Sequence, residues 1–407
     1  MKIPRVPSPI RRPCVFAVAA LLALCAPVSA QSAFVFDDTV VRTYQIEVSP
    51  QDWDDILNNR LVEGEYRPCT WRFGGEEYRD VRIRLRGESS RDLEGWAKPN
   101  LKVKFRTSQP FYNMKAISLD HLGDAAQMSE RLSYGIYNRR GVNAPRYAHA
   151  RINLKLGSAE PSYLGLFGVE ELIDEGFLTR RFDDDRGRLY RMRPDTDPFV
   201  YRGDAWGLYV PRPFEPKTDS TTDHTALVDV VRTVSDSPPD RFREGVGTRM
   251  SLSTLMEYIA IESVIGEADG YLADFDDGLP FYNNTFFYQL PADGRFYMIV
   301  WDRDNSFSGV RLAFSVLRGL ERSNLTRWMW ADGPSRAEYL SRCREIAEQQ
   351  LNPSILLPEL ERVYQQIRPH VLEDPNKPLT NEEFEQAVVD LRQFIRQRYE
   401  NVMREVP

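Results

Sequence analysis

The spacing of apolar residues changes along this 407-residue chain. Up to about residue 170, apolar and polar side chains tend to alternate, which is the period of a β-strand. In "VRIRLR", residues 81–86, every second side chain is apolar and the others are arginines. From about residue 225 the apolar positions recur at helical spacing, and two long amphipathic helices follow residue 336. The sequence therefore predicts an α+β fold, with a β-rich N-terminal lobe over residues 31–175 and a mainly helical C-terminal lobe over residues 176–407.

The first 30 residues have the composition of a secretory signal peptide. Four basic residues precede a short apolar stretch at residues 15–24, and the small residues "VSA" at 28–30 form a cleavage site. A lipoprotein signal at Cys25 is disfavoured because Leu24 occupies a position where a small residue is expected. The apolar stretch is too short to span a bilayer, and no later stretch predicts a transmembrane segment. We therefore expect cleavage after Ala30 and an exported protein, periplasmic or secreted, that begins at Gln31.

The charge and the metal-binding residue types exclude two classes of function. The net charge is -7, and it becomes -11 once the signal segment is removed, because 49 basic and 60 acidic residues remain. Such an acidic chain is not expected to bind nucleic acid. Only four histidines and no Cys-x-x-Cys pair are present, so a zinc site is not expected either. The two mature cysteines, Cys69 and Cys343, are far apart in sequence, which leaves both a disulfide and free thiols open.

An apolar run ends in two aspartates close to residue 300. In "FYMIVWDRDNSFSG", residues 296–309, the carboxylates of Asp302 and Asp304 would project from the same face if the strand continued. Neighbouring carboxylates repel unless a cation or proton lies between them, so the pattern favours a divalent-metal site over a solvated turn. An EF-hand is excluded, because Phe307 and Ala313 occupy the positions that need Gly and Glu. A haloacid-dehalogenase-type phosphatase needs a long βαβ region after this run, whereas about a hundred helical residues follow here. The metal-holding aspartate of a kinase remains as the third template.

Other groups that phosphoryl transfer needs occur in kinase-like order. Transfer from a nucleotide needs a cation on the phosphates, metal ligands, and a carboxylate near the attacking hydroxyl. The candidates are the small polar turn "LRGESSRD" with Ser89 and Ser90, then Lys102 or Lys104, Glu170 or Glu171, Asp269, Asn283 or Asn284, and finally Asp302. Each of these residue types alone is more often a surface residue. Their order of Asp, Asn, strand and Asp is that of a kinase catalytic loop followed by its metal aspartate.

The chain resembles the CotH-type kinases, a family named for a spore-coat protein and with an atypical protein-kinase-like fold. The resemblance covers nearly all of the mature chain and rests on "VRIRLRGESS", "LSYGIYNRRGVNAPRYAHARINL", "YLGLFGVEELIDEGFL", "IESVIGEADGY", "NNTFFYQLPADGRFYMIVWDRDNSF" and "LTNEEFEQAVVDLRQFIRQRYENV". A conventional Gly-rich loop, HRD string and DFG string are absent, as they are in the family. The resemblance implies the use of ATP and Mg²⁺, with Mn²⁺ or Ca²⁺ as further options.

The resemblance also implies roles for single residues in the C-terminal lobe. Asp269 in "DGY" matches the catalytic aspartate, Asn284 the metal-side asparagine, and Asp302 the principal Mg²⁺ ligand, with Asp304 as its neighbour. The chain departs from the family in the long insertion "LADFDDGLPFY" between "DGY" and "NN". The insertion carries two rivals for the catalytic role, Asp276 and Asp277.

In the N-terminal lobe, the resemblance implies an ion pair that holds the nucleotide phosphates. Glu171 matches the glutamate of that pair, and Lys104 is the first choice for the lysine, with Lys102 as the second.

The leading hypothesis is an exported, Mg²⁺-dependent protein kinase that transfers the γ-phosphate of ATP to a protein hydroxyl. One alternative is a catalytically inert, kinase-shaped surface or scaffolding protein whose acidic loops bind calcium structurally. Another is a protein AMP-transferase, because a kinase-like fold can bind ATP in another orientation. The expected partner is a protein substrate, and the sequence indicates neither its identity nor an oligomeric state.

Overall fold

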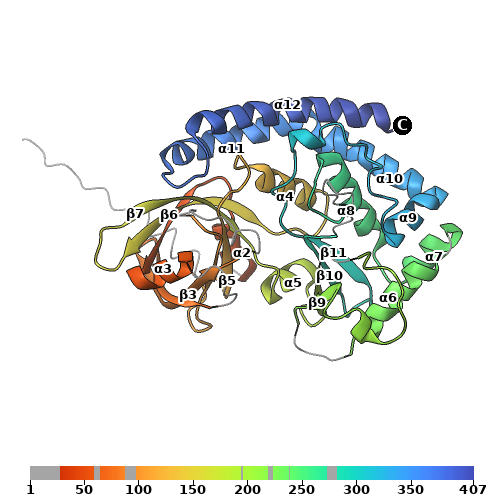
Figure 1. The fold of residues 1–407 in the computed structure, drawn as a ribbon, viewed down its shortest axis with the longest axis horizontal. Coiled ribbons are helices and arrows are strands. Elements are labelled where there is room, and N and C mark those ends of the chain that lie inside the picture. Colours follow the sequence, from red (N-terminus) through yellow and green to blue (C-terminus); the bar gives the residue numbers. More distant parts are fainter. Residues whose placement is uncertain are drawn as a thin grey trace, which may run out of the picture.

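The chain folds into a β-rich lobe and a mainly helical lobe that lie side by side (Figure 1). The computed structural model describes residues 28–58, 65–87, 98–193, 196–218, 223–237, 239–272 and 282–407. In the β-rich lobe, seven strands close into a barrel in the order β1-β2-β3-β4-β5-β7-β6. These strands are β1 (Arg42–Val48), β2 (Arg67–Phe73), β3 (Glu76–Leu85), β4 (Leu101–Lys104), β5 (Ala116–Asp120), β6 (Tyr147–Leu156) and β7 (Ser162–Glu170). Helices α2 (Val28–Val35), α3 (Pro50–Asn58) and α4 (Ser129–Arg139) belong to the same half of the chain.

The alternation seen in the sequence decides which side chains fill the barrel. Val103 on β4 pairs with Ile83 on β3 and with Ile117 on β5, and all three are buried in the barrel core. The neighbouring pair, Arg84 and Lys102, faces outward because successive side chains of a strand point to opposite sides. Both of these cations line the space between the lobes. The pattern that builds the core therefore also delivers positive charge to the interlobe surface.

The helical lobe is built around a four-stranded sheet in the order β11-β10-β8-β9. Its strands are β8 (Arg188–Met192), β9 (Phe214–Pro216), β10 (Thr285–Gln289) and β11 (Phe296–Val300). Its helices are α5 (Glu175–Phe182), α6 (Thr225–Asp236), α7 (Phe242–Val246), α8 (Leu252–Ile265), α9 (Asn324–Ala331), α10 (Gly333–Ile346), α11 (Pro353–Glu373) and α12 (Asn381–Glu405). Helix α8 is buried around most of its circumference, which agrees with its nearly continuous apolar sequence. The predicted α+β architecture, with a β-rich lobe followed by a mainly helical lobe, is confirmed.

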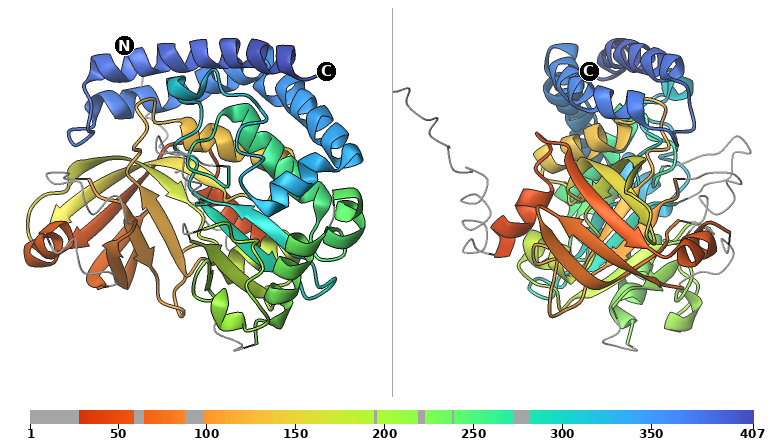
Figure 2. Two further views of the ribbon diagram at one scale, coloured as in Figure 1. Left: turned by 45° about the vertical axis from the view of Figure 1, so that its right-hand side comes forward. Right: turned by 90° about the vertical axis from the view of Figure 1, so that its left-hand side faces the viewer.

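Helices α11 and α12 form an antiparallel pair that extends over both lobes (Figure 2). Asp374, which follows α11, is buried and accepts hydrogen bonds from Leu166 N at 2.9 Å and Lys98 Nζ at 2.8 Å. Leu166 lies on β7, and Lys98 lies just before β4. Gly165 leaves room for this contact, because a Cβ atom there would lie 2.8 Å from both carboxylate oxygens of Asp374. The connection between α11 and α12 is therefore anchored in the barrel lobe.

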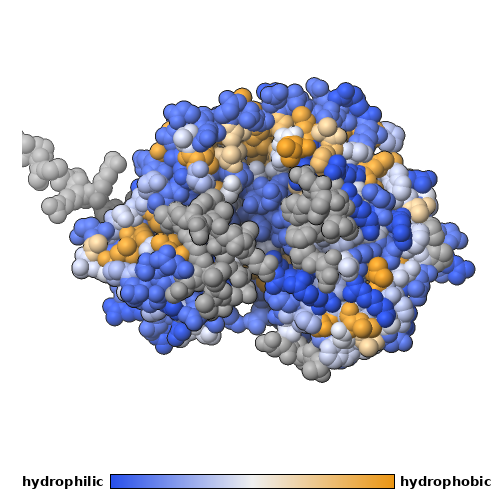
Figure 3. All heavy atoms as spheres, viewed as in Figure 1, coloured by the Kyte–Doolittle hydropathy of each residue, from blue (hydrophilic) through white to orange (hydrophobic). Residues whose placement is uncertain are grey.

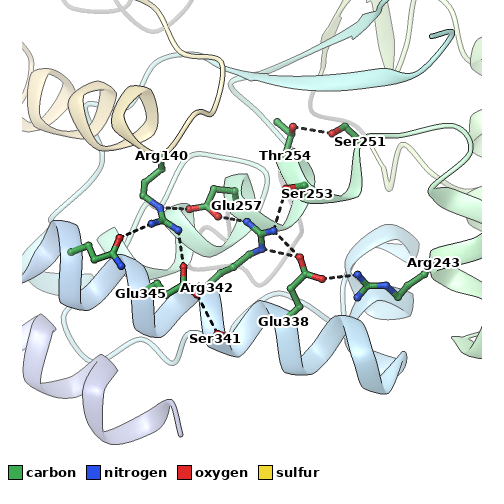
Figure 4. A network of polar contacts seen from close by, with 11 residues as sticks. Arg140, Arg243, Ser251, Ser253, Thr254, Glu257, Glu338, Ser341, Arg342 and Glu345 are labelled. Carbon is green, nitrogen blue, oxygen red and sulfur yellow. Dashed lines mark hydrogen bonds and ion pairs between the residues drawn. The ribbon is translucent and has the colours of Figure 1, made fainter.

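A network of ion pairs joins α4 to α8 and α10 (Figure 4). Glu257 on α8 is 4% exposed and accepts hydrogen bonds from Arg140, at the end of α4, and from Arg342 on α10. Arg140 also pairs with Glu345 at 3.2 Å, and Arg342 with Glu338 at 2.7 Å. Each oxygen of the buried carboxylate thus has a guanidinium partner, which fixes α4 relative to the helical lobe.

The two cysteines of the described residues are free thiols that lie in different cores. Cys69 is buried in the barrel, and Cys343 is buried in the helical lobe. Of the two states that the sequence left open, the structure has the unpaired one.

The first described residues of the chain form helix α2. The expected cleavage position after Ala30 falls within this helix and stays a prediction, because residues 1–27 lie outside the described residues. No described helix has both the length and the apolar character needed to cross a membrane.

Candidate active site

A cleft of about 1240 Å³ lies between the two lobes, where Figure 3 shows the surface hollowed. The barrel supplies mainly basic side chains to it, among them Arg84, Arg86, Lys102, Lys104 and Lys115. The helical lobe supplies carboxylates and amides, among them Asp269, Asn283, Asn284, Asp302 and Asp304, and also the cations Arg186, Arg191 and Lys217. The barrel side of the cleft is therefore mainly basic, and the predicted catalytic and metal residues gather on the opposite side.

An apolar section of the cleft lies beside the segment that connects the lobes. It is lined by Leu172, Ile173, Leu178, Leu189 and Phe286. Leu178, Leu189 and Phe286 belong to a small hydrophobic cluster on the cleft-facing side of the second sheet. A flat apolar ring system, such as a nucleotide base, fits the chemistry of this section.

A tight turn after α8 delivers Asp269 to the cleft. The helix ends at Gly266, which adopts a left-handed conformation with φ of 68°. The side chain of Glu267 then stabilises the turn, because its Oε1 accepts a hydrogen bond from Asp269 N at 2.7 Å. A second buried acid, Glu262, accepts one from Leu272 N at 3.0 Å. Gly270 is needed between them, because a Cβ atom there would lie 1.8 Å from Glu262 Oε1.

The carboxylate of Asp269 is held by two side-chain amides. Asn284 Nδ2 donates to Asp269 Oδ2 at 2.8 Å, and Asn283 Nδ2 lies 3.3 Å from Oδ1. Burial and the negative charge of Asp302 raise the pKa of Asp269 to about 7. A carboxyl group with a pKa near neutrality is suited to accept a proton from a hydroxyl.

The β10–β11 hairpin places Asn284 beside the loop that carries Asp302. Thr285 at the start of β10 pairs with Val300 at the end of β11, so the residues just outside the hairpin face each other. The contact continues with a hydrogen bond of 3.1 Å from Trp301 N to Asn284 O. Asn284 and Asp302 both have left-handed backbones, with φ of 51° and 53°. Such conformations carry strain and occur preferentially at functional sites.

The expectation that Asp302 and Asp304 share one face of a strand is wrong. Strand β11 ends at Val300, and the left-handed conformation of Asp302 breaks the alternation. Both carboxylates nevertheless line the cleft. Burial raises the pKa of both, and the charge of Asp302 raises that of Asp304 further. A cation near these groups would offset the repulsion between them.

An arginine–glutamate pair lies opposite these carboxylates. The sequence offered Glu170 as one of two candidate glutamates but did not indicate Arg86 as its partner. Arg86 Nη2 lies 2.9 Å from Glu170 Oε2, and Glu170 is 1% exposed. Arg86 also donates to Ser118 Oγ and lies over the ring of Trp301, 4.6 Å from its centroid. Burial raises the pKa of Glu170 to about 7, although Arg86 opposes this shift. The signal in the sequence was Arg86 itself, the last outward residue of the alternating run before Gly87.

The predicted ion pair between Lys104 and Glu171 is not formed. Glu171 accepts hydrogen bonds from Arg146 Nη2 at 2.7 Å and Arg180 Nε at 2.9 Å, and it is not among the described residues that line the cleft. Its neighbour Glu170 points to the other side of the chain, as consecutive residues of an extended segment do. Lys104 Nζ lies 5.9 Å from the ring centroid of Tyr66.

Other predicted residues divide between the cleft and the undescribed segments. Lys102 lines the cleft, and burial lowers its pKa. Ser89, Ser90, Asp276 and Asp277 lie outside the described residues, so their assignments stay predictions.

The donor set of the cleft fits Mg²⁺ better than a protein cage for calcium. In the described part of the chain, no three acidic, histidine or cysteine side chains converge as a ready-made metal site. Asp302 and Asn284 lie on adjoining loops and offer a carboxylate and an amide oxygen. Mg²⁺ is typically held by one or two carboxylates together with substrate phosphates and water, whereas Ca²⁺ takes six to eight oxygen ligands. The residues present therefore fit an ion that arrives with a nucleotide.

Comparisons with known proteins identify a family and several similar proteins. The inner spore coat protein H of Bacillus subtilis (strain 168) is 23% identical over 363 residues, which cover 87% of this chain and 94% of that protein. The proinflammatory kinase CtkA of Helicobacter pylori gives a TM-score of 0.31 at 10% identity, over 74% of this chain and 94% of that one. The Golgi casein kinase gives a TM-score of 0.29 at 9% identity, over 92% and 77% of the two chains. The family described as CotH kinase protein matches residues 83–402, so the chain belongs to the CotH kinase family.

Proposed function

We propose that the protein is an exported, Mg²⁺-dependent kinase that transfers the γ-phosphate of ATP to a hydroxyl group of a protein. The observation that carries this proposal is the meeting of Asp269, Asn284 and Asp302 in one cleft, opposite the Arg86–Glu170 pair. Phosphoryl transfer needs cations beside the phosphates, together with carboxylates that hold the metal ion and orient the acceptor hydroxyl. Positioning and charge neutralisation supply most of its catalysis.

Asp269 acts on the acceptor hydroxyl in this proposal. Its carboxylate orients the hydroxyl and takes its proton as the oxygen forms a bond to the γ-phosphorus, while the bond from that phosphorus to the β–γ bridging oxygen breaks and ADP leaves. The amides of Asn283 and Asn284 hold the carboxylate in place through its two oxygens. The raised pKa of Asp269 keeps it basic enough for this transfer.

Asp302 and Asn284 would hold Mg²⁺, and Asp304 would be a second or outer ligand. The bound ion supplies positive charge to the β- and γ-phosphates. On the barrel side, Arg86 with Lys102 and Lys104 would neutralise the phosphate oxygens, and Glu170 keeps Arg86 in place. This assignment replaces the predicted pairing of Lys104 with Glu171.

Nucleotide and metal titrations followed by thermal unfolding test the binding half of the proposal. We expect ATP to raise the unfolding temperature when Mg²⁺ or Mn²⁺ is present and to have little effect without either ion. Stabilisation by Ca²⁺ alone, with no response to ATP, would instead support the scaffolding alternative.

Mass spectrometry of the protein and of added acceptor proteins, after incubation with ATP and Mg²⁺, tests the transfer half. A phosphate addition supports the kinase, and an AMP addition supports the AMP-transferase. A folded protein that binds ATP and Mg²⁺ but modifies neither itself nor any of a broad set of proteins would contradict both.

The proposal of export rests on the composition of residues 1–30. N-terminal sequencing of the protein recovered from outside the cytoplasm should give Gln31 as the first residue. Recovery of Met1 on the exported protein would contradict the cleavage.

A further inference from the structure

Helix α4 holds two consecutive backbone amides of the loop that follows β11. Asp302 N donates a hydrogen bond of 2.8 Å to the hydroxyl of Tyr134, and Arg303 N donates one of 3.2 Å to Glu130 Oε1. Glu130 and Tyr134 are four residues apart, so they project from the same face of the helix. They are 4% and 1% exposed, so bulk water does not compete for these amides.

The Tyr134 hydroxyl also reaches the opposite side of the cleft. It donates to Glu170 Oε1 at 2.7 Å, while Glu170 Oε2 lies 2.9 Å from Arg86 Nη2. A hydroxyl donates and accepts at the same time, and this one uses both capacities. Tyr134 therefore links the ion pair on the barrel side to the backbone of Asp302.

The backbone of Asp302 is held from its carbonyl side as well. The guanidinium of Arg303 is fully buried and donates to the carbonyl oxygens of Trp301 at 2.9 Å and Asp302 at 3.2 Å. Such contacts stabilise a residue with φ of 53°, because the left-handed conformation is less favourable than the right-handed one for every residue except glycine, although aspartate adopts it more often than most. Hydrogen bonds support Asp302 from both sides.

We propose that Tyr134 and Glu130 are positioning residues, which set the left-handed backbone of Asp302 and thereby aim its carboxylate into the cleft. The proposal rests on the proposed function in one respect, the role of Asp302 as a metal ligand. The control that α4 exerts on the loop is independent of that role. Because the Tyr134 hydroxyl contacts both Asp302 N and Glu170, a displacement of α4 would move Asp302 and the Arg86–Glu170 pair together.

Hydrogen–deuterium exchange of Tyr134→Phe tests the hydrogen bond directly. The substitution keeps the ring and removes the hydroxyl, so Asp302 N loses its acceptor. We expect the amides of the peptide over residues 298–306 to exchange about tenfold faster or more. Tyr137→Phe is the matched control, because Tyr137 lies on the same helix, is also buried, and has a hydroxyl without a hydrogen-bond partner. Equal exchange of this peptide in the two variants would overturn the proposal.

A pair of substitutions at Glu130 keeps the test valid if Tyr134→Phe does not fold. Glu130→Gln retains an acceptor oxygen for Arg303 N, whereas Glu130→Leu does not. We expect fast exchange of the same peptide only in Glu130→Leu. Protection that is unchanged in Glu130→Leu would contradict a positioning role for this residue.

The metal dependence of nucleotide binding tests the consequence for the site. In Tyr134→Phe, the Mg²⁺ concentration needed for half of the ATP-induced thermal stabilisation should rise tenfold or more, whereas Tyr137→Phe should match the wild type. A wild-type protein that does not respond to ATP and Mg²⁺ at all would contradict the proposed function and leave the exchange result standing. A wild-type response that Tyr134→Phe reproduces in full would contradict the role of Tyr134 in the metal site.

Discussion

At the scale of single residues, two carboxylates of the same cleft have different surroundings. Asp269 accepts hydrogen bonds from two side-chain amides, whereas Asp302 lies close enough to Arg86 for that charge to oppose the upward shift of its pKa. Carboxylates in different environments are suited to different roles. The environment of Asp269 suits a base, and that of Asp302 suits a charged ligand between the phosphates and the loop.

Substitution by asparagine should therefore separate binding from transfer. Asp302→Asn keeps the size and removes the charge, so we expect folding to survive while Mg²⁺-dependent ATP binding is lost and transfer falls a hundredfold or more, about 3 kcal/mol. Asp269→Asn should keep Mg²⁺-ATP binding and lose transfer. Isothermal titration with Mg²⁺-ATP and a phosphotransfer assay would measure the two effects. Full activity of Asp302→Asn, together with loss of activity in Asp276→Asn or Asp277→Asn, would place the metal site in the inserted acidic segment.

The cations of the barrel side should differ in importance. Arg86 is fixed by Glu170, Ser118 and Trp301, whereas Lys104 is exposed at the end of β4. Arg86→Lys keeps the positive charge but loses the planar guanidinium and its paired N–H donors. We expect this substitution to reduce kcat/KM for ATP by roughly tenfold to a hundredfold. Lys104→Ala should cost less than about tenfold and leave the unfolding temperature unchanged, because its side chain adds little to the core. A larger loss in Lys104→Ala than in Arg86→Lys would make Lys104 the main phosphate ligand.

Glu262 below the Asp269 turn should make stability depend on pH. Burial raises the pKa of Glu262 from an ordinary 4.5 to about 7, and its Oε2 has no hydrogen-bond partner. Because the folded-state pKa lies above the unfolded one, the protonated group favours the folded state at low pH, and this contribution is lost as the pH rises through 7. We expect the free energy of unfolding of Glu262→Gln, relative to that of the wild type, to be higher at pH 8 than at pH 5 by up to about 3 kcal/mol. Urea unfolding at the two pH values would measure this difference. A difference that stays constant with pH would mean that Glu262 remains charged throughout.

At the scale of helices and strands, the sequence was most informative where a pattern is local. Alternation in residues 81–86 predicted the outward row that contains Arg86, and the apolar run before Asp302 predicted a strand that ends at the cleft. The order of Asp269, Asn284 and Asp302 predicted which residues the hairpin brings together. These features depend on neighbours in sequence, so the period of the side chains reveals them.

The features that the sequence did not reveal depend on the pairing of distant elements. Glu170 meets Arg86 because β7 pairs with β5, which places Glu170 beside Ser118, and a shift of one residue would have presented Glu171 instead. The contact of Tyr134 with Asp302 spans 168 residues and depends on the packing of α4. Neither the pairing register nor the packing of a helix leaves a periodic signal at the residues concerned.

At the scale of the whole molecule, the C-terminal helices join the two lobes. Helix α11 leaves the helical lobe and ends at the barrel (Figure 2). Asp374, which follows it, accepts hydrogen bonds there from Leu166 N and Lys98 Nζ. Asn376 extends the contact by donating from Nδ2 to Leu164 O at 2.7 Å. A cleft between lobes keeps its shape only if the lobes keep their relative positions. The anchor at Asp374 therefore belongs to the architecture of the cleft although it is not part of its lining.

Loss of the Asp374 carboxylate should destabilise the protein far more than loss of the carboxylate of its sequence neighbour, Glu373. Asp374→Ala leaves Lys98 buried without its carboxylate, and burial already lowers the pKa of this lysine. Removing one partner of a buried ion pair typically costs about 3–5 kcal/mol, and we expect a loss of this size in urea unfolding. Glu373→Ala is the matched control, because Glu373 pairs with Arg151 at the surface and its side chain is 64% exposed, so little change is expected. The double variant Lys98→Met, Asp374→Leu should recover only part of the lost stability, because it removes both buried charges together but still leaves Leu166 N without its acceptor. Equal effects of Asp374→Ala and Glu373→Ala would mean that the lobes are held together by other contacts of α11 and α12.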